Sequence, residues 1–185
     1  MKRDRWAVAA GVLVLGVLGA LPGCGVEDRT VRDEEPGGPA RASECAGRVP
    51  GRDLHESLAS VSSRAQRHPD VFTGLSVDEG ARTADVYRVP SAAFDADVCS
   101  AAGKGVTLRL YDTDVNRRDL DALAARVSAD MNRWDGTFEL REVGVDERGW
   151  VHVGVDDPRA ARDVLVAEFG GEHLRVVEVG EASAD

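Results

Sequence analysis

The sequence Val-Asp-Glu-Arg-Gly-Trp-Val-His-Val-Gly-Val-Asp-Asp-Pro, residues 145–158, contains in succession a turn, a strand and the start of a helix. The polar run that begins at Asp146 predicts the turn. The three valines that follow alternate with other residues, as in a strand with one buried face. Asp157 followed by Pro158 predicts a helix start, because Asp caps helices and proline is favoured at the first helical position.

The segments on either side extend this order to helix-strand-strand-helix-strand over residues 114–180. Before the turn, a strand is predicted at 138–145, with a bulge near Arg141-Glu142 because the apolar alternation changes parity there. After the quoted stretch, the second helix is expected to end at Gly170-Gly171, and a final strand to cover 173–179.

The first helix of this unit is predicted to start after Asn116, a residue type that favours the N-cap position, and to end at Asp135-Gly136. Its apolar residues recur at helical spacing and form one stripe. The stripe consists of Leu120, Leu123, Val127, Met131 and Trp134.

Residues 44–113 are predicted to contain the same five elements in the same order. Asp53 and Glu56 have the spacing of a capping box, which starts a helix that ends before Pro69. The remaining elements are expected to be strands at 71–77 and 83–89, a short helix capped by Ser91, and a strand at 106–110.

This order has two interpretations. In the first, the chain contains two duplicated αββαβ units, 44–113 and 114–180, because the segment 72–79 is similar to 138–147. In the second, the chain from Val106 onward forms a ferredoxin-like βαββαβ unit that follows an N-terminal extension. Both predict an α+β fold in which helices pack on antiparallel-rich sheet.

Residues 1–23 have the layout of a secretory signal peptide, with basic residues at the start and then an apolar run that ends at Leu21. There, Leu21-Pro22-Gly23-Cys24 resembles the lipobox of bacterial lipoproteins, in which Leu and two small residues precede a cysteine. Leu21, Gly23 and Cys24 match, and Pro22 stands where that family usually has Ala, Ser or Thr. The resemblance covers residues 1–24 only. It implies cleavage before Cys24, a diacylglyceryl group on its thiol, and a lipid anchor in the cell membrane outside the cytoplasm.

The chain has three cysteines. If Cys24 carries lipid, Cys45 and Cys99 remain, and a disulfide between them is expected in an exported protein. It would close a loop of about 55 residues, for which chain entropy gives a stabilisation of about 4 kcal/mol.

Residues 24–43 are predicted to be a disordered, lipid-anchored tether. They combine charged residues with a Pro-Gly-Gly-Pro sequence and contain two isolated valines, too little apolar surface to offset the entropy of ordering. About 19 such residues would hold the domain ~25 Å from the lipid on average. Residues 181–185 are a short tail.

The charge of the chain excludes some partners. The net charge is −10, and the leader contributes +2, so the chain after cleavage would carry −12. This balance argues against nucleic acid, whose protein partners are basic, and against electrostatic attraction to anionic lipid.

No motif predicts a metal, a cofactor or a catalytic group. Asp112, Asp114 and Asn116 have the spacing of the first oxygen ligands of a calcium loop. Arg117 and Leu123 replace the required Gly and Glu, so helix capping by Asn116 is the favoured interpretation.

The histidines give no stronger signal. His55-Glu56 begins like a zinc-protease helix, but Ala59 occupies the position of the second histidine. The four histidines at 55, 68, 152 and 173 belong to separate predicted elements and are expected to be ordinary surface residues.

Trp150 and His152 are expected on the strand face opposite the alternating valines. This pair would form a contact surface if exposed. The favoured alternative is that a helix covers this face, since a layered fold must bury one face of its sheet.

The sequence therefore predicts a membrane-anchored extracytoplasmic lipoprotein that acts as a non-enzymatic binding or interaction module of the cell envelope. Its predicted partners are the membrane, through lipid on Cys24, and an envelope protein. The ligand-binding residues are not predicted. The alternative is a small extracytoplasmic hydrolase that uses carboxylates, since α+β folds also host chemistry without recognisable motifs.

Overall fold

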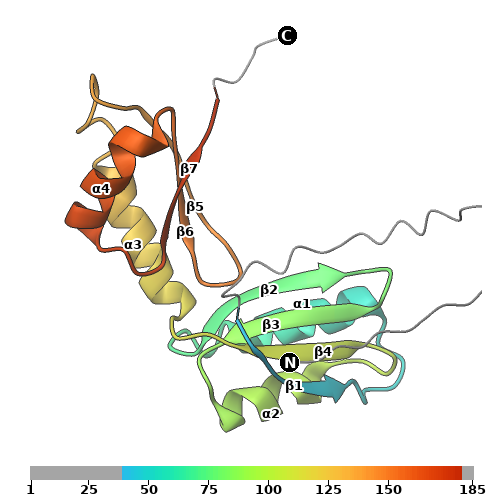
Figure 1. Ribbon diagram of the computed structural model, residues 1–185. Coiled ribbons are helices and arrows are strands. Elements are labelled where there is room, and N and C mark those ends of the chain that lie inside the picture. Colours follow the sequence, from blue (N-terminus) through green and yellow to red (C-terminus); the bar gives the residue numbers. More distant parts are fainter. Residues whose placement is uncertain (1–38, 181–185) are drawn as a thin grey trace, which may run out of the picture. The chain divides into compact units, whose positions relative to one another are not determined.

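The computed structural model describes residues 39–180 (Figure 1). The leader, Cys24 and residues 25–38 of the predicted tether lie outside the described residues, as does the tail 181–185. The predictions made for them therefore stay predictions. None of the helices within residues 39–180 is long and apolar enough to span a bilayer.

The described residues form seven strands and four helices. The strands are β1 (Arg41–Ala46), β2 (Phe72–Asp78), β3 (Thr83–Arg88), β4 (Thr107–Asp112), β5 (Leu140–Val145), β6 (Val151–Val155) and β7 (Leu174–Glu178). The helices are α1 (Leu54–Ala65), α2 (Ala92–Ala101), α3 (Arg117–Ala129) and α4 (Pro158–Phe169).

The strands form two sheets, one of order β1-β4-β3-β2 and one of order β5-β6-β7. The β3–β4 and β6–β7 pairs are parallel and the other pairs are antiparallel, so the predicted α+β class is confirmed. The order from α1 to β4 is the same as that from α3 to β7, and a duplication as the cause of it stays a prediction. The ferredoxin-like alternative is wrong, because β4 pairs with β1 and β3 and not with the second sheet.

The predicted helix starts are confirmed. The side chains of Asp53, Ser91, Asn116 and Asp157 each accept a hydrogen bond from a backbone N–H in the first turn of the helix that follows. Each such cap stabilises its helix by about 1 kcal/mol.

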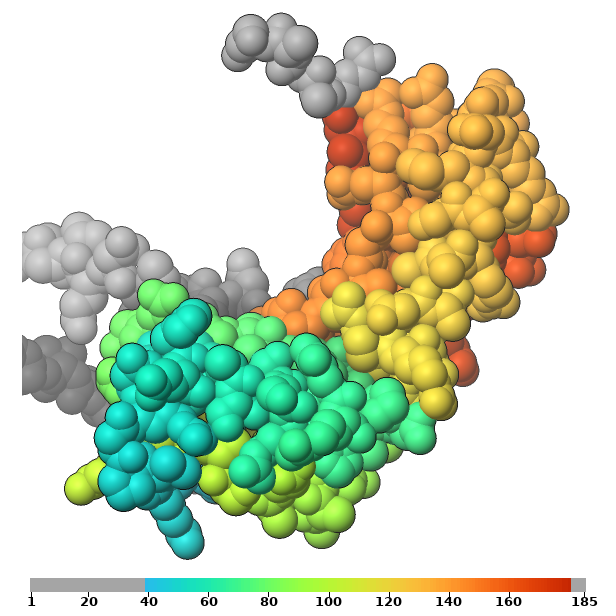
Figure 2. Space-filling view, turned by 180° about the vertical axis from the view of Figure 1, so that it is seen from behind, coloured from blue at the N-terminus to red at the C-terminus, as the bar shows by residue number. Residues whose placement is uncertain are grey.

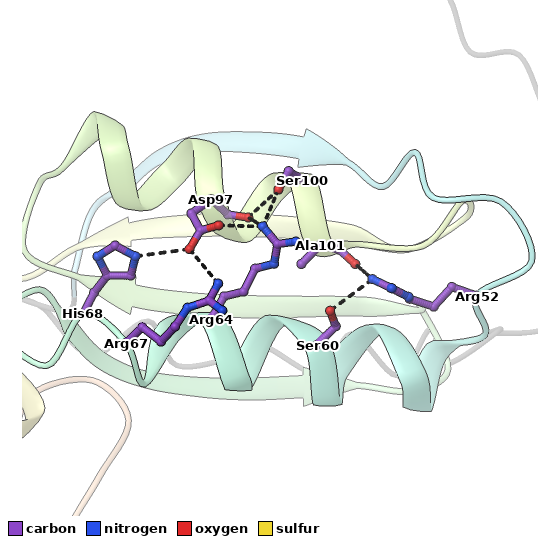
Figure 3. Close-up of polar contacts among 8 residues, drawn as sticks. All are labelled: Arg52, Ser60, Arg64, Arg67, His68, Asp97, Ser100 and Ala101. Atoms are coloured by element: carbon purple, nitrogen blue, oxygen red, sulfur yellow. Dashed lines mark hydrogen bonds and ion pairs between the residues drawn. The ribbon is translucent and has the colours of Figure 1, made fainter.

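Helices α1 and α2 cover one face of the first sheet. The buried core there includes Val61, Phe94, Val98, Leu108 and Leu110. Above this core the two helices are joined by polar contacts, which Figure 3 shows in detail.

The Asp97 carboxylate of α2 accepts three of these contacts: from Arg64 at 2.5 Å, from His68 at 3.2 Å and from Arg67 at 3.3 Å. The hydrogen bond from His68, followed by those from the two arginines, lowers the pKa of Asp97. The carboxylate therefore stays charged, and its ion pair with Arg64 links α2 to α1.

The predicted disulfide is confirmed. Cys45 of β1 is bonded to Cys99 of α2, with the Cα atoms 6.0 Å apart. The bond attaches an edge strand to the helical layer. It leaves Cys24 as the odd cysteine of the chain.

Helices α3 and α4 cover one face of the second sheet (Figure 1). Figure 2, from the opposite side, shows residues of α3 in yellow and of α4 in red on the surface of this half. The core beneath them includes Leu120, Leu123, Val153, Val155 and Leu165. The bulge predicted near Arg141-Glu142 is confirmed, because the β5–β6 register shifts between Leu140 and Glu142.

Two predicted boundaries are wrong. The tether was expected to include residues 41–43, but these begin β1, whose backbone pairs with β4 although its side chains are mostly exposed. Helix α3 ends at Ala129 rather than at Asp135-Gly136, because the following residues are rich in the poor helix formers Asp, Asn and Gly. Met131 and Trp134 still pack against the core, from turns instead of a helix.

Candidate functional site: a cleft between three loops

Three loops surround a cavity of about 540 Å³. They are the end of β4 with the segment after it, the turn between β5 and β6, and the connection from α4 to β7, and Pro39 before β1 also lines the cavity. The lining residues are Pro39, Asp112, Thr113, Asp114, Arg148, Gly149, Trp150, Glu172 and His173. We call this cavity the cleft.

The turn between β5 and β6 is held by Asp146. Its Oδ1 accepts from the backbone N–H groups of Arg148 at 2.9 Å and Trp150 at 2.8 Å, and its Oδ2 lies 2.9 Å from His152 Nε2. Burial opposes ionisation of Asp146, but these three hydrogen bonds outweigh it and lower the pKa of the carboxyl group. Asp146 thus fixes the backbone that carries two residues of the cleft, Arg148 and Trp150.

The same turn packs against the first sheet. A Cβ atom at Gly74 would lie 2.3 Å from the Cα of Glu147, so only glycine allows β2 to approach the turn this closely. Beside this contact the guanidinium of Arg148 interacts with Tyr87, whose pKa is raised chiefly by burial. Arg148 is therefore held on the wall of the cleft from both halves of the chain.

The segment after β4 is fixed by buried hydroxyl groups. Thr73 Oγ1 lies 2.7 Å from Thr113 Oγ1 and donates to the carbonyl oxygen of Val115 at 2.5 Å. Asn116 then caps α3 by accepting from the N–H of Asp119 at 3.0 Å. These contacts leave the intervening Asp114 in solvent, with its side chain 89% exposed.

His173 has a strained backbone, with a φ of 59° in the region that favours glycine. Its Nδ1 donates to the carbonyl oxygen of Gly149 at 3.0 Å, because a carbonyl can only accept. The other ring nitrogen, Nε2, lies 3.7 Å from Asp114 Oδ1. Backbone strain of this kind is often found at functional sites.

Trp150 is half-buried immediately before β6. Helices α3 and α4 pack on the valine face of this strand (Figure 1), so the expectation that a helix covers the face of Trp150 and His152 is wrong within residues 39–180. The guanidinium of Arg175 lies over the indole, 4.1 Å from the ring centroid. Trp150 therefore contributes to the cleft with its orientation fixed by a cation–π contact.

The carboxylates of the cleft differ in their partners. Asp112 forms an ion pair with Arg88, a side chain that is only 4% exposed and also pairs with Asp95. Asp112 and Asn116 thus have structural roles, in line with the capping interpretation of the calcium-like spacing. Within residues 39–180, no group of three or more His, Cys, Asp or Glu residues is arranged to hold a metal ion.

The sequence singled out only part of this site. Sequence patterns point to Asp112, Asp114 and Trp150, but none assigns Arg148, Glu172 or His173 to a site. Glu172 and His173 follow the Gly170-Gly171 helix stop, and no local motif joins them to the distant Asp114. Of the four histidines, His173 alone lines the cleft, whereas His152 supports it through Asp146.

Comparisons with other proteins give no family for this chain: no family model matches it, and neither does any curated protein.

Proposed function

We propose that the chain is a lipid-anchored extracytoplasmic protein that binds a ligand in the cleft without transforming it. The observation that carries this proposal is the convergence of three loops, from both halves of the chain, around a cavity of about 540 Å³. Cavities of about 300–1,000 Å³ are typical of small-molecule sites. The contacts of Asp146, Thr73 and Gly74 hold these loops in place before any ligand arrives.

The chemistry of the lining favours a ligand that donates hydrogen bonds. Asp114 and Glu172 are exposed acceptors, whereas the cationic Arg148 of the lining is already engaged with Tyr87. Trp150 supplies an aromatic surface beside them. Hydroxyl and amino groups, such as those of a sugar or an amino sugar, fit this combination of acceptors and an aromatic ring.

Two features of the chain support the proposed lipid anchor, namely the N-terminal sequence and the pairing of the cysteines. Residues 1–24 resemble a lipoprotein leader, and the disulfide between Cys45 and Cys99 leaves Cys24 for lipid. The membrane is therefore the first proposed partner, and an envelope component that carries the ligand is the second. The net charge of −10 argues against nucleic acid as a ligand.

One observation favours the alternative, a hydrolase that uses carboxylates. His173 is strained, and its Nε2 lies near Asp114, which resembles an acid–base pair. However, the Asp114 side chain is 89% exposed, whereas catalytic carboxylates are usually partly withdrawn from water. Binding without chemistry is the better account of this geometry.

The test uses the fluorescence of Trp150 in a leaderless variant that carries Cys24→Ser. Trp134→Phe removes the other tryptophan of the chain after the leader, so that the signal reports on the cleft alone. N-acetylglucosamine, glucosamine and spermidine are titrated as donor-rich probes, with citrate as the acceptor-rich control. We expect saturable changes with at least one donor-rich probe and none with citrate, and no change in the mass of the bound probe.

Two variants assign the binding to the cleft. Asp114→Asn keeps the size of the side chain and removes its charge, and His173→Asn removes the imidazole ring at a backbone conformation that asparagine tolerates. Each is expected to weaken binding of the responsive probe. The proposal fails if citrate binds equally well, if the variants bind like the unmodified protein, or if no probe binds. A probe that is cleaved would instead support the hydrolase.

A further inference from the structure

The edges of the two sheets are not alike. In the described residues, β1 and β2 are the edges of the first sheet, and β5 and β7 are the edges of the second. The pairing register shifts in β1, in β2 and in β5, so each of these edges carries a bulge. A bulge increases the local twist of an edge strand and interrupts its regular backbone pattern, which hinders pairing with another chain. Only β7, among these four, pairs without a shift.

The free side of β7 presents regular backbone groups. In the parallel pair with β6, the carbonyl oxygen of His173 accepts from Val151 and the N–H of Val179 donates to Val155. Because the pattern alternates, the odd-numbered residues of β7 face β6. The N–H and C=O groups of Leu174, Val176 and Glu178 therefore point to the open edge.

A groove of about 370 Å³ lies beside this edge, between β7 and α4. Its lining residues are Arg162, Val166, Gly171, Leu174, Arg175, Val176 and Val177. Val166 is a large apolar side chain left 39% exposed. Both charged residues in the lining are arginines, in a chain whose net charge is −10.

We propose that β7 is a docking edge for an extended strand of a partner protein, with an apolar side chain in the groove and an acidic side chain beside it. Strand addition would satisfy the open backbone groups of β7 and extend its sheet by one strand. The apolar side chain would cover Val166 and Val176, and the acidic one would meet Arg162. This surface is separate from the lining of the cleft, so the inference does not depend on the proposed ligand.

The charges favour a partner over a second copy of this chain. If two copies paired through β7, each would bring the Arg162 guanidinium of its groove to the interface, whereas Arg175 is engaged with Trp150. Like charges in such an interface oppose association, whereas an acidic strand would be attracted. The occupant is therefore expected to be an acidic, apolar, extended peptide.

The test uses a fluorescein-labelled peptide of about eight residues with valine and glutamate two positions apart, so that both side chains face the groove beside α4. It is titrated into the leaderless Cys24→Ser protein, and binding is followed by fluorescence anisotropy and by hydrogen exchange of the β7 amides. We expect saturable binding, with protection of the outward amides of Leu174, Val176 and Glu178. A peptide with lysine in place of glutamate, and one with a central proline, are expected to bind at least about tenfold more weakly.

Two variants of α4 distinguish binding in the groove from non-specific binding of the peptide. Val166→Glu places a charge in the groove and is expected to weaken binding about tenfold or more. Val164→Glu is the matched control, because Val164 is 37% exposed on the same helix but does not line the groove. Val176→Pro removes one outward N–H without removing a bond to β6, and it is also expected to weaken binding.

The proposal is overturned if the peptide does not bind the folded protein, or if the lysine peptide binds equally well. It is also overturned if both valine variants of α4 lose binding together. Protection of β7 that increases with protein concentration in the absence of peptide would assign the edge to self-association instead.

Discussion

Gly74 of β2 and Glu147 of the β5–β6 turn meet through their backbones, and a Cβ atom on Gly74 would lie 2.3 Å from the Cα and 2.4 Å from the carbonyl oxygen of Glu147. No side chain can relieve such a contact by changing its rotamer. The contact joins the first sheet to the turn that carries Arg148 and Trp150 of the cleft. The shape of the cleft therefore depends on a residue outside it.

Gly74→Ala is expected to move this turn and to lower the free energy of unfolding by about 1–3 kcal/mol, the usual cost of overpacking. Urea denaturation measures this loss. Gly144→Ala is the matched control, since nothing lies within 4 Å of a Cβ atom at Gly144 in β5. Equal stability of the two variants would show that the backbone contact has no effect.

Asp146 predicts a pH dependence of stability. Its pKa is lowered in the folded protein, so its contribution is complete above about pH 4, the unfolded value, and is lost as the pH falls through the lowered folded value. Asp146→Asn is expected to reduce the loss of unfolding free energy on acidification, measured by urea denaturation between about pH 2 and pH 6. Asp163→Asn, at an exposed position of α4, should leave this loss on acidification unchanged.

Replacement of both Cys45 and Cys99 by serine is expected to lower the free energy of unfolding by about 4 kcal/mol in the chain-entropy description. The same loss should follow reduction of the unmodified protein, which is the control for the substitutions themselves. Denaturation midpoints that do not respond to reductant would contradict a stabilising disulfide.

Asp157→Ala removes the N-cap of α4, where the carboxylate accepts from the N–H groups of Arg159 and Ala160. A loss of about 1 kcal/mol in the free energy of unfolding is expected. Asp157→Asn should retain most of the stability, because asparagine caps helices equally well. A similar loss in both variants would argue against capping as the role of Asp157.

The sequence predicted those features that depend on neighbouring residues. The capping residues, such as Asp157, mark the helix starts, and the change of parity at Arg141-Glu142 marks the bulge in β5. The pairing of Cys45 with Cys99 followed from counting the cysteines. In these cases the physical cause lies within a few residues or in simple composition.

The sequence could not predict features that arise from tertiary contacts. Strand β1 has mostly exposed side chains, so no apolar alternation marks it, and only pairing with β4 and the disulfide of Cys45 reveals it. The proximity of Asp114 to His173 depends on how the elements between them fold. For the same reason the cleft and the regular edge of β7 were visible only in the structure.

The central claim, a lipid-anchored extracytoplasmic protein, is tested most directly by the intact mass of the full-length chain purified without reductant from the membrane fraction of a bacterial host. We predict a polypeptide that begins at Cys24, is heavier by a diacylglyceryl group, and lacks the two hydrogens of a Cys45–Cys99 disulfide. A Cys24→Ala variant should lose the lipid mass and leave the membrane fraction. An unmodified chain that is cut elsewhere, or an uncut chain with free thiols, would contradict the account.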